Sequence, residues 1–542
     1  MLLGWTIPAL VLTLGSVTAT TPYPHSKGYT SSVFVVADGA LSSGNIVTLE
    51  TLGGGLARQR PALYRVSTSP TETSSYALWL QEMEKQGVES NTTYLNDFPG
   101  LLRHFGQQIA GFVLFEGGNN STNSAISYCA SYGTLDGKVA VAVDVAEDKT
   151  LAILKALGVT LLEDVRAMDP ATVYQSRKTL FSHRMVSFQP VSKAADLAEY
   201  AVFGGFPTVE YSTDKGASLA EQILADMQQE GPLGAALGWG PEEDYVATIG
   251  HYGAYVHASD WAKDISPMAN LPVHTAVKFD AKLEQPHKPR AMTPFVAEEK
   301  HTVAFLFTDG DNLQWLLNVF FTDPTWFGAK ERGEVPVGWT MAPALVDMAP
   351  LILNYAYSTA TANDSFVCAP SGIGYTYPEA QSDLEGFASL TGEAMSAADM
   401  QVLNVIGEAA QDFNVSLLKP FLDSDDIDAV FYYSFGSGYA GCNGRMDWAN
   451  GKPIITPRVS FWGNATSGPM LGLDALVDDI LRQPTDPTSP KGYSLVPVHA
   501  WTHSYADVVA AATKLMQRGV DVVSPAELAS RVTANVKPSA MA

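Results

Sequence analysis

The segment FTDGDN places three residues capable of acid–base chemistry directly after an apolar run. Residues 303–307 read as a buried strand, and Asp309, Asp311 and Asn312 follow it. Carboxylates at positions i and i+2 can share one side of an extended chain, and Gly310 between them permits a sharp turn. Such a pair could serve in glycoside hydrolysis or help to bind a metal ion. A structural role is also open, because Asp and Asn cap helices of the kind that NLQWLLNVF predicts.

A second carboxylate is expected from two other strand ends. GWGPEED carries Glu242 and Glu243 after one strand-like run, and ASDW carries Asp260 after the next. In parallel strands the carboxyl ends meet at one rim, and a glycosidase needs two carboxyl groups roughly 5 to 10 Å apart. We predict Asp311 as one catalytic carboxylate, with Asp309 positioning it or tuning its pKa by like charge. Glu242 or Asp260 is the expected partner, although both could equally be acids at the start of a helix.

Aromatic and polar side chains near the same strand ends are predicted to bind the substrate. Sugar rings stack on flat apolar rings, and eight of the ten tryptophans lie between Trp239 and Trp501. His499 could bond a sugar hydroxyl, and its spacing to His503 would suit a metal only in a helix, whereas LVPVHAW indicates a strand. Arg458 could orient a carboxylate or be a surface cation. The predicted substrate-binding residues are Asn312, Gly372, Gly374, Tyr375, Tyr377, Trp239, Trp339, Arg458, His499 and Trp501.

The stretch SGIGYTYP, residues 371–378, matches the pattern GxGYxYP at every fixed position. In this it resembles the GxGYxYP family of putative glycoside hydrolases, and GWGPEED, ASDWAKD, FTDGDN, VGWTMAP and PVHAW fall in the order expected of that family. The resemblance covers most residues from about 60 to 530 and implies a glycosidase-like fold with an acidic, aromatic cleft. It supplies no catalytic residues, so the site predictions rest on the residues themselves. The signature falls on Gly372, Gly374, Tyr375, Tyr377 and Pro378, and its glycines would let the backbone approach a ligand.

Alternating strands and helices must position these residues. Between about residues 60 and 165, strand-sized apolar runs such as KVAVAVDVA alternate with amphipathic stretches, which is typical of a parallel sheet with crossover helices. In the second half, strand-like runs end in acids, aromatics, glycine and proline, as in a (β/α) barrel. The predicted fold is α/β, with an N-terminal α/β layered region followed by a (β/α) barrel-like C-terminal domain.

The domain boundaries follow from this pattern and from one linker, residues 280–300, which is rich in proline and charge. Residues 1–19 are apolar, uncharged and end in small residues, which predicts a signal peptide, with a membrane anchor as the alternative. The predicted divisions are a signal peptide over 1–19, an N-terminal α/β domain over 30–165, a second α/β region over 166–290 that could contribute strands to the barrel, and a barrel-like catalytic domain over 291–535.

Composition limits the partners. The formal net charge is 33 minus 57, or −24, so the surface repels phosphate backbones and anionic membranes, and nucleic acid is not an expected partner. Three cysteines allow at most one intrachain disulfide. A secretory route is also supported by six N-x-[ST] sequons, at Asn91, Asn119, Asn120, Asn363, Asn414 and Asn464.

Together these features predict a secreted glycoside hydrolase that acts on a poly- or oligosaccharide through paired carboxylates, with no cofactor and no metal. Two alternatives remain open at this point. One is a metal-dependent carbohydrate esterase, because GVDVVSPAELASRV resembles the closing strand and helix of polysaccharide deacetylases. The other is a non-catalytic glycan-binding cell-wall protein, which would keep the aromatic platforms without needing the acids.

Overall fold

The computed structural model describes residues 21–133, 137–193, 197–231, 233–240, 243–259, 268–278, 282–286 and 298–538. The predicted signal peptide and most of the predicted linker lie outside these residues. Within the described part of the chain, no helix is both long and apolar enough to cross a membrane. All three cysteines, Cys129, Cys368 and Cys442, are buried and free.

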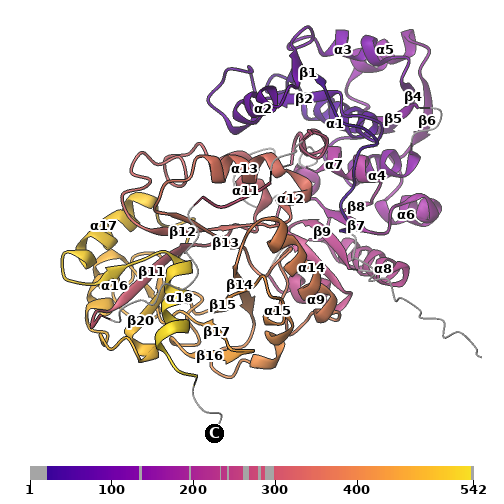
Figure 1. The fold of residues 1–542 in the computed structure, drawn as a ribbon. Coiled ribbons are helices and arrows are strands. Elements are labelled where there is room, and N and C mark those ends of the chain that lie inside the picture. Colours follow the sequence, from indigo (N-terminus) through magenta and orange to yellow (C-terminus); the bar gives the residue numbers. More distant parts are fainter. Residues whose placement is uncertain are drawn as a thin grey trace, which may run out of the picture.

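Two small parallel sheets form the first part of the chain (Figure 1). The first has the strand order β2-β1-β3 and the second the order β5-β4-β6. Apolar runs such as VAVAVD in β5 are buried on both faces because helices cover them, as expected of parallel strands. This confirms the predicted alternation of strands and helices. The strands are β1 Ser32–Ala37, β2 Leu63–Val66, β3 Glu89–Asn91, β4 Ile109–Phe115, β5 Val139–Asp144 and β6 Thr160–Asp164, and the helices are α1 Ser43–Ala57, α2 Ser75–Lys85, α3 Phe98–Phe105, α4 Ser121–Tyr132 and α5 Asp148–Ala156.

A third parallel sheet follows, in the order β10-β9-β7-β8. Two of its strands, β9 and β10, are short and fully buried, and both lead toward the C-terminal region. The strands are β7 Met185–Phe188, β8 Thr208–Val209, β9 Gly234–Gly238 and β10 Ala254–His257, and the helices are α6 Pro170–Arg177, α7 Ala198–Gly204, α8 Asp214–Glu230, α9 Tyr245–His251 and α10 Leu271–His274.

The C-terminal region is one sheet in the order β16-β17-β15-β14-β13-β12-β11-β20-β18-β19, with β21 paired to β11. Its neighbours are parallel except for β16 and β17. The strands are β11 Thr302–Phe307, β12 Val337–Met341, β13 Asp364–Cys368, β14 Val402–Gly407, β15 Ala429–Ser434, β16 Met446–Ala449, β17 Lys452–Ile455, β18 Ser460–Phe461, β19 Met470–Leu471, β20 Tyr493–Val498 and β21 Asp521–Val522. The helices are α11 Leu313–Asn318, α12 Leu345–Met348, α13 Pro350–Ser358, α14 Leu384–Ala397, α15 Lys419–Leu422, α16 Leu473–Leu481, α17 Tyr505–Met516 and α18 Pro525–Asn535.

This large sheet is curled. Helix α18 contacts both β17 and β20, although five strands separate these two in the sheet order. A flat sheet could not bring both to one helix, so the strands bend around α18 as a half-barrel (Figure 1). The predicted barrel-like C-terminal domain is confirmed in this partly closed form.

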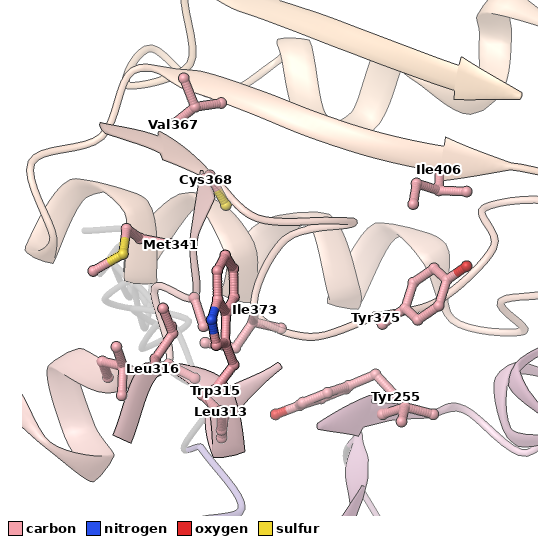
Figure 2. Packing of buried hydrophobic residues seen from close by; sticks show 14 of the residues in the cluster. Tyr255, Leu313, Trp315, Leu316, Met341, Val367, Cys368, Ile373, Tyr375 and Ile406 are labelled. Atoms are coloured by element: carbon pink, nitrogen blue, oxygen red, sulfur yellow. The ribbon is translucent and has the colours of Figure 1, made fainter. Parts of the chain in front are cut away.

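The third sheet and the half-barrel share a continuous hydrophobic core. One cluster of buried residues contains Tyr255 of β10, Trp315 of α11, and Ile373 and Tyr375 of the signature stretch. Figure 2 draws these side chains together with their apolar neighbours. Because burial of this apolar surface is favourable, the core fixes the third sheet against the half-barrel and with it the strand ends that meet between them.

Candidate active site

Strand ends from the third sheet and the half-barrel enclose a cleft of about 840 Å³. Its walls are formed by residues that follow the carboxyl ends of strands, which is where α/β folds usually place their sites. Trp239, Glu243 and Asp244 follow β9, Asp309, Asp311 and Asn312 follow β11, residues 435–439 follow β15, Trp462 follows β18, and His499 and Trp501 follow β20. Ala258, Pro370, Tyr375, Ile406 and Met470 complete the described lining.

The turn after β11 presents Asp309 and Asp311 to the cleft. Asp309 adopts a left-handed backbone conformation with φ of 69°, and its carboxylate accepts a hydrogen bond from the Thr308 hydroxyl. The N–H of Gly310 donates to Thr340 Oγ1 at 2.9 Å, and that hydroxyl donates to the carbonyl of Phe307 at 2.8 Å. The turn is therefore tied to the neighbouring strand β12.

Position 310 requires glycine because there is no space for a side chain, and not because its backbone needs a positive φ angle. A Cβ at this position would lie 1.8 Å from the carbonyl oxygen of Thr340, far inside van der Waals contact. Asn312 then ends the turn, because its side chain accepts from the N–H of Trp315 at 3.0 Å and caps α11. The capping role that the sequence left open thus falls on Asn312, while both aspartates face the cleft.

Three carboxyl groups influence one another in this cleft. Burial raises the pKa of Asp311 well above its usual range, and the charges of Asp309 and Glu243 raise it further. Burial also raises the pKa of Glu243, and Asp309 adds to that rise, while a hydrogen bond from Tyr375 opposes it. Like charges and a low local dielectric both favour the protonated form. Burial and the neighbouring carboxylates therefore favour the protonated form of Asp311 more than is usual for an aspartate.

The signature stretch holds Glu243 in place. The backbone of Tyr375 pairs with Val256 of β10 through N–H to carbonyl bonds of 2.8 and 2.9 Å. Its hydroxyl donates to Glu243 Oε1 at 2.7 Å, and the hydroxyl of Tyr377 lies 3.3 Å from that of Tyr375. The half-barrel thus supplies the residue that orients a carboxylate of the third sheet.

The signature glycines serve packing instead of ligand approach. A Cβ on Gly374 would lie 2.4 Å from the ring of Tyr255, and one on Gly372, where φ is 138°, would lie 2.3 Å from Thr391 Oγ1. Neither glycine lies in the described lining of the cleft, and Tyr377 is also outside it. The expectation that these glycines bring backbone to a ligand is corrected accordingly, because protein side chains already occupy that space.

Aromatic rings form much of the rest of the cleft. Trp239 stacks on Tyr375 with ring centroids 6.4 Å apart, and Trp462 stacks on His499 at 3.7 Å with an angle of 8° between the planes. Trp501 packs on Trp315 of the core at 5.2 Å. Stacked neighbours hold the rings rigidly, which suits the binding of flat apolar faces.

Two further predicted substrate-binding residues, Trp339 and Arg458, lie outside the described lining of the cleft. Trp339 is fully buried, stacks on Phe307 at 4.7 Å and donates its N–H to Asp364 at 2.8 Å. Arg458 donates to the side chain of Gln483 and does not line the cleft. Both predictions are therefore wrong. Trp339 lies inside strand β12 and packs in the core, and Arg458 precedes β18 and bonds to Gln483. The sequence alone does not reveal these contacts.

The histidines occupy different environments. His499 lines the cleft, and its pKa is lowered by burial although the charge of Asp309 opposes that shift. His503 stacks on Phe461 at 3.6 Å and its Nε2 lies 3.0 Å from the carbonyl of Gly463. Among the described residues, no group of three or more His, Cys, Asp or Glu side chains has the geometry to hold a metal ion.

The two predicted partner carboxylates, Glu242 and Asp260, lie outside the described residues. Glu243, the neighbour of Glu242 in GWGPEED, is the acid of that strand end that the structure places beside Asp309 and Asp311. Sequence reasoning also passed over Tyr439 and Trp462. Their signal was present in AVFYYSFGSGY and RVSFWGN, where aromatic residues follow a strand end.

The sequons differ in accessibility. Asn363 is partly buried, and its amide nitrogen donates to the carbonyl of Gly333 at 2.6 Å, so the atom that would carry a glycan is engaged. The other five are exposed: Asn91, Asn119, Asn120, Asn414 and Asn464.

Comparisons with known proteins agree with this architecture. Three sequence models of one family match the chain, described as "GxGYxYP_N 1st domain" over residues 32–107, "GxGYxYP third domain" over 182–270 and "GxGYxYP putative glycoside hydrolase C-terminal domain" over 299–533. A crystal structure described as a putative hydrolase from Bacteroides thetaiotaomicron superimposes with a TM-score of 0.80 at 24% identity, covering 95% of this chain and 97% of that one. At this identity the likeness establishes the fold. A comparison with proteins of curated function finds no match.

Proposed function

The chain belongs to the GxGYxYP family, and from this premise we propose that it is a glycoside hydrolase whose cleft cleaves a poly- or oligosaccharide between carboxyl groups. The observation that carries the proposal is the position of Asp311, a carboxyl group with a strongly raised pKa, beside Asp309 and Glu243 in an aromatic-lined cleft. Glycoside hydrolysis needs one carboxyl group that is protonated and one that is ionised.

Asp311 is the proposed general acid. Burial and the charge of Asp309 favour its protonated form, so it can donate a proton to the glycosidic oxygen as the bond to the leaving sugar breaks. Asp309 does not need to touch the substrate for this role. Its charge acts on Asp311 across the Gly310 turn, which fixes the two side chains relative to each other.

Glu243 is the proposed second carboxylate, in place of its neighbour Glu242, which was expected from the strand end alone. The hydrogen bond from Tyr375 favours its ionised form against the effect of burial. An ionised Glu243 can activate a water molecule or attack the anomeric carbon, and the separation of the two carboxyl groups in the substrate complex decides which. Trp239, Trp462 and Trp501 supply rings on which the sugar faces stack.

We further propose that the enzyme is an extracellular glycoprotein. An apolar leader over residues 1–19 and five exposed sequons support this location. Sequencing of the mature N-terminus should find cleavage near residue 19. Treatment with a peptide-N-glycosidase, which removes N-linked glycans, should lower the mass of the protein. An uncleaved N-terminus would favour the membrane-anchor alternative.

The test of the hydrolase is release of reducing ends from a broad panel of polysaccharides and glycoproteins. Asp311→Asn and Glu243→Gln should each lower the rate by about 10²- to 10⁴-fold, the usual contribution of an acid or base. Asp426→Asn is a matched control, because Asp426 is exposed and precedes β15, at the opposite strand end from the cleft. It should leave the rate unchanged.

Other outcomes of the same panel separate the alternatives. Release of acetate without new reducing ends would favour the carbohydrate esterase. Glycan binding that survives Asp311→Asn, with no bond cleaved by the wild-type protein, would favour the binding protein. Cleavage that persists at the wild-type rate in Asp311→Asn would contradict the assignment of this residue as the acid.

A further inference from the structure

The cleft contains more acidic groups than hydrolysis requires. Two carboxyl groups suffice for the reaction, yet Glu243, Asp244, Asp309 and Asp311 all lie in the described lining. No lysine or arginine belongs to that described lining. Within the described part of the chain, no residue forms an ion pair with Asp244 or Asp311, and no other residue donates a hydrogen bond to either carboxyl group.

The negative field extends outward from the cleft. Burial raises the pKa of Glu408, and the charges of Glu379 and Asp244 raise it further. Glu408 follows β14, whose Ile406 lines the cleft, and its side chain is exposed. A concave site with walls of one sign focuses the field and concentrates ligands of the opposite sign. These acidic walls therefore disfavour the binding of uronic acids and sulfated sugars, which are also negatively charged.

A second observation points to a ligand in the same place. Asn312 is 5% exposed and lines the cleft. Its side-chain oxygen is used by the helix cap, whereas its amide NH₂ has no hydrogen-bond partner in the described part of the chain. This NH₂ group lies at the cleft and is available to donate to a polar ligand group such as a hydroxyl.

The aromatic residues would also accept a cation. Tyr439 lines the cleft together with Asp309, Glu243 and Asp311. Burial raises the pKa of its hydroxyl, and the charges of these three acids raise it further. Trp462 is tilted against Tyr439 with centroids 5.2 Å apart. The faces of such rings attract ammonium groups as well as sugar rings.

We propose that the substrate of this cleft is a glycan that carries free amino groups, namely a hexosamine polymer or oligomer whose ammonium groups meet Asp244, the carboxylate of the described lining that the proposed catalysis does not use. The inference rests on the proposed glycoside hydrolase function and names its substrate class. Asp244 is the residue most suited to bind an ammonium group, because it is exposed at the cleft and forms no ion pair within the described part of the chain.

The experiment compares one polymer in two chemical states. Partially de-N-acetylated hexosamine polymers of several linkages are each assayed before and after re-acetylation of their amino groups, which leaves linkage and length unchanged. In mildly acidic, low-salt buffer we expect kcat/KM for the amino form to exceed that for the re-acetylated form by about tenfold or more, equivalent to about 1.4 kcal/mol. High salt should reduce this ratio.

Variants identify the source of the preference. Asp244→Asn should lower the ratio between the two forms, and Asp426→Asn, with the same change of charge far from the cleft, should leave it as in the wild-type protein. Equal or faster cleavage of the re-acetylated polymer, or efficient cleavage of a uronic acid polymer, would overturn the inference while leaving the hydrolase intact.

A binding measurement keeps the two proposals distinguishable. Folded Asp311→Asn protein is titrated with oligomers of the same amino and re-acetylated pair. Tighter, salt-sensitive binding of the amino form supports the inference even if no polymer is cleaved by the wild-type protein, in which case the hydrolase proposal fails. Binding of both forms with equal affinity overturns the inference.

Discussion

The two acidic walls of the cleft are built by different means. The wall after β11, here called the β11 wall, consists of Asp309, Asp311 and Asn312 and is fixed by bonds within the half-barrel, such as that from Gly310 to Thr340 at 2.9 Å. The wall after β9, here called the β9 wall, carries Glu243, and Glu243 is held by a hydroxyl from the signature stretch at 2.7 Å. The β11 wall is therefore fixed by hydrogen bonds within one sheet, whereas the β9 wall depends on contact between two sheets.

This difference explains the composition of the signature. A docking contact between sheets needs a strand-like backbone to pair with β10, a glycine that fits against the ring of Tyr255, and a polar tip that reaches the cleft. Gly374 and Tyr375 meet these needs. The signature thus reaches the cleft through Tyr375, while Ile373, Tyr375 and Tyr377 are buried in the shared core. Each wall can accordingly be disturbed separately.

The largest effect is expected from Gly310→Ala in the β11 wall. The added Cβ would lie 1.8 Å from a backbone oxygen, which cannot rotate away as a side chain can. The turn must shift, and a displacement of about 1 Å at reacting groups costs about 10²-fold in rate. We expect a loss of activity of at least that size together with about 3 kcal/mol of stability. Denaturant unfolding and steady-state kinetics measure both; wild-type values would contradict the geometry of this turn.

Gly374→Ala tests the β9 wall in the same way and should have a smaller effect. Its Cβ would meet the ring of Tyr255 at 2.4 Å and the carbonyl of Val256 at 3.0 Å. Part of this clash can be relieved by movement of a side chain, so we expect a loss of about 1–2 kcal/mol. Gly28→Ala is the matched control, since a Cβ added there would have its nearest neighbouring atom at 4.0 Å. A Gly374→Ala protein as stable as this control would argue against docking by the signature.

The sequence predicted more of the β11 wall than of the β9 wall, and the reason is physical. A buried apolar run followed by FTDGDN contains its own strand, turn and cap, so Asp309 and Asp311 could be located from local signals. Glu243 is selected by a hydroxyl 132 residues away in the sequence. Nothing in GWGPEED distinguishes it from Glu242 without knowledge of that contact.

The roles of Trp339 and of the signature glycines were hidden for the same reason. An exposed aromatic platform and a core tryptophan have the same residue type, and only the contacts with Phe307 and Tyr505 identify Trp339 as core. The fold class was more accessible, because alternating strands and helices leave a period in the sequence. The curl of the large sheet around α18 is a long-range feature, and it appeared in the sequence as no more than a succession of strand ends.

Tyr375→Phe removes the hydroxyl that links the signature to Glu243 while keeping the ring. A hydrogen bond to a charged group contributes about 1.5–3 kcal/mol, so kcat/KM should fall by about ten- to a hundredfold. That hydrogen bond lowers the pKa of Glu243, and its loss raises this pKa. The proposed mechanism requires ionised Glu243, so the acidic limb of the pH–rate profile should move to higher pH.

The alkaline limb gives the internal control for Tyr375→Phe. In the proposed mechanism this limb reports the loss of the proton from Asp311. The pKa of Asp311 is raised by burial and by neighbouring carboxylates rather than by the tyrosine, so the limb should stay in place. Tyr377→Phe should move the acidic limb less, because Tyr377 reaches Glu243 through Tyr375. A uniform fall in rate with both limbs unmoved would mean that Tyr375 only packs against its neighbours.

Substitution of Asn312 is expected to have the smallest effect. It separates the two proposed functions of this residue in the β11 wall, which are capping of helix α11 and binding of the substrate. Asn312→Ala removes both the helix cap and the open amide, whereas Asn312→Ser keeps an oxygen that can cap α11 and removes the amide donors. Alanine should therefore cost about 1 kcal/mol of stability that serine largely restores. Both variants should raise KM by a few-fold, as expected from about 0.5–1.5 kcal/mol for one hydrogen bond. If serine restores stability and also KM, the amide does not bind substrate, and the β11 wall contributes to binding through its carboxyl groups alone.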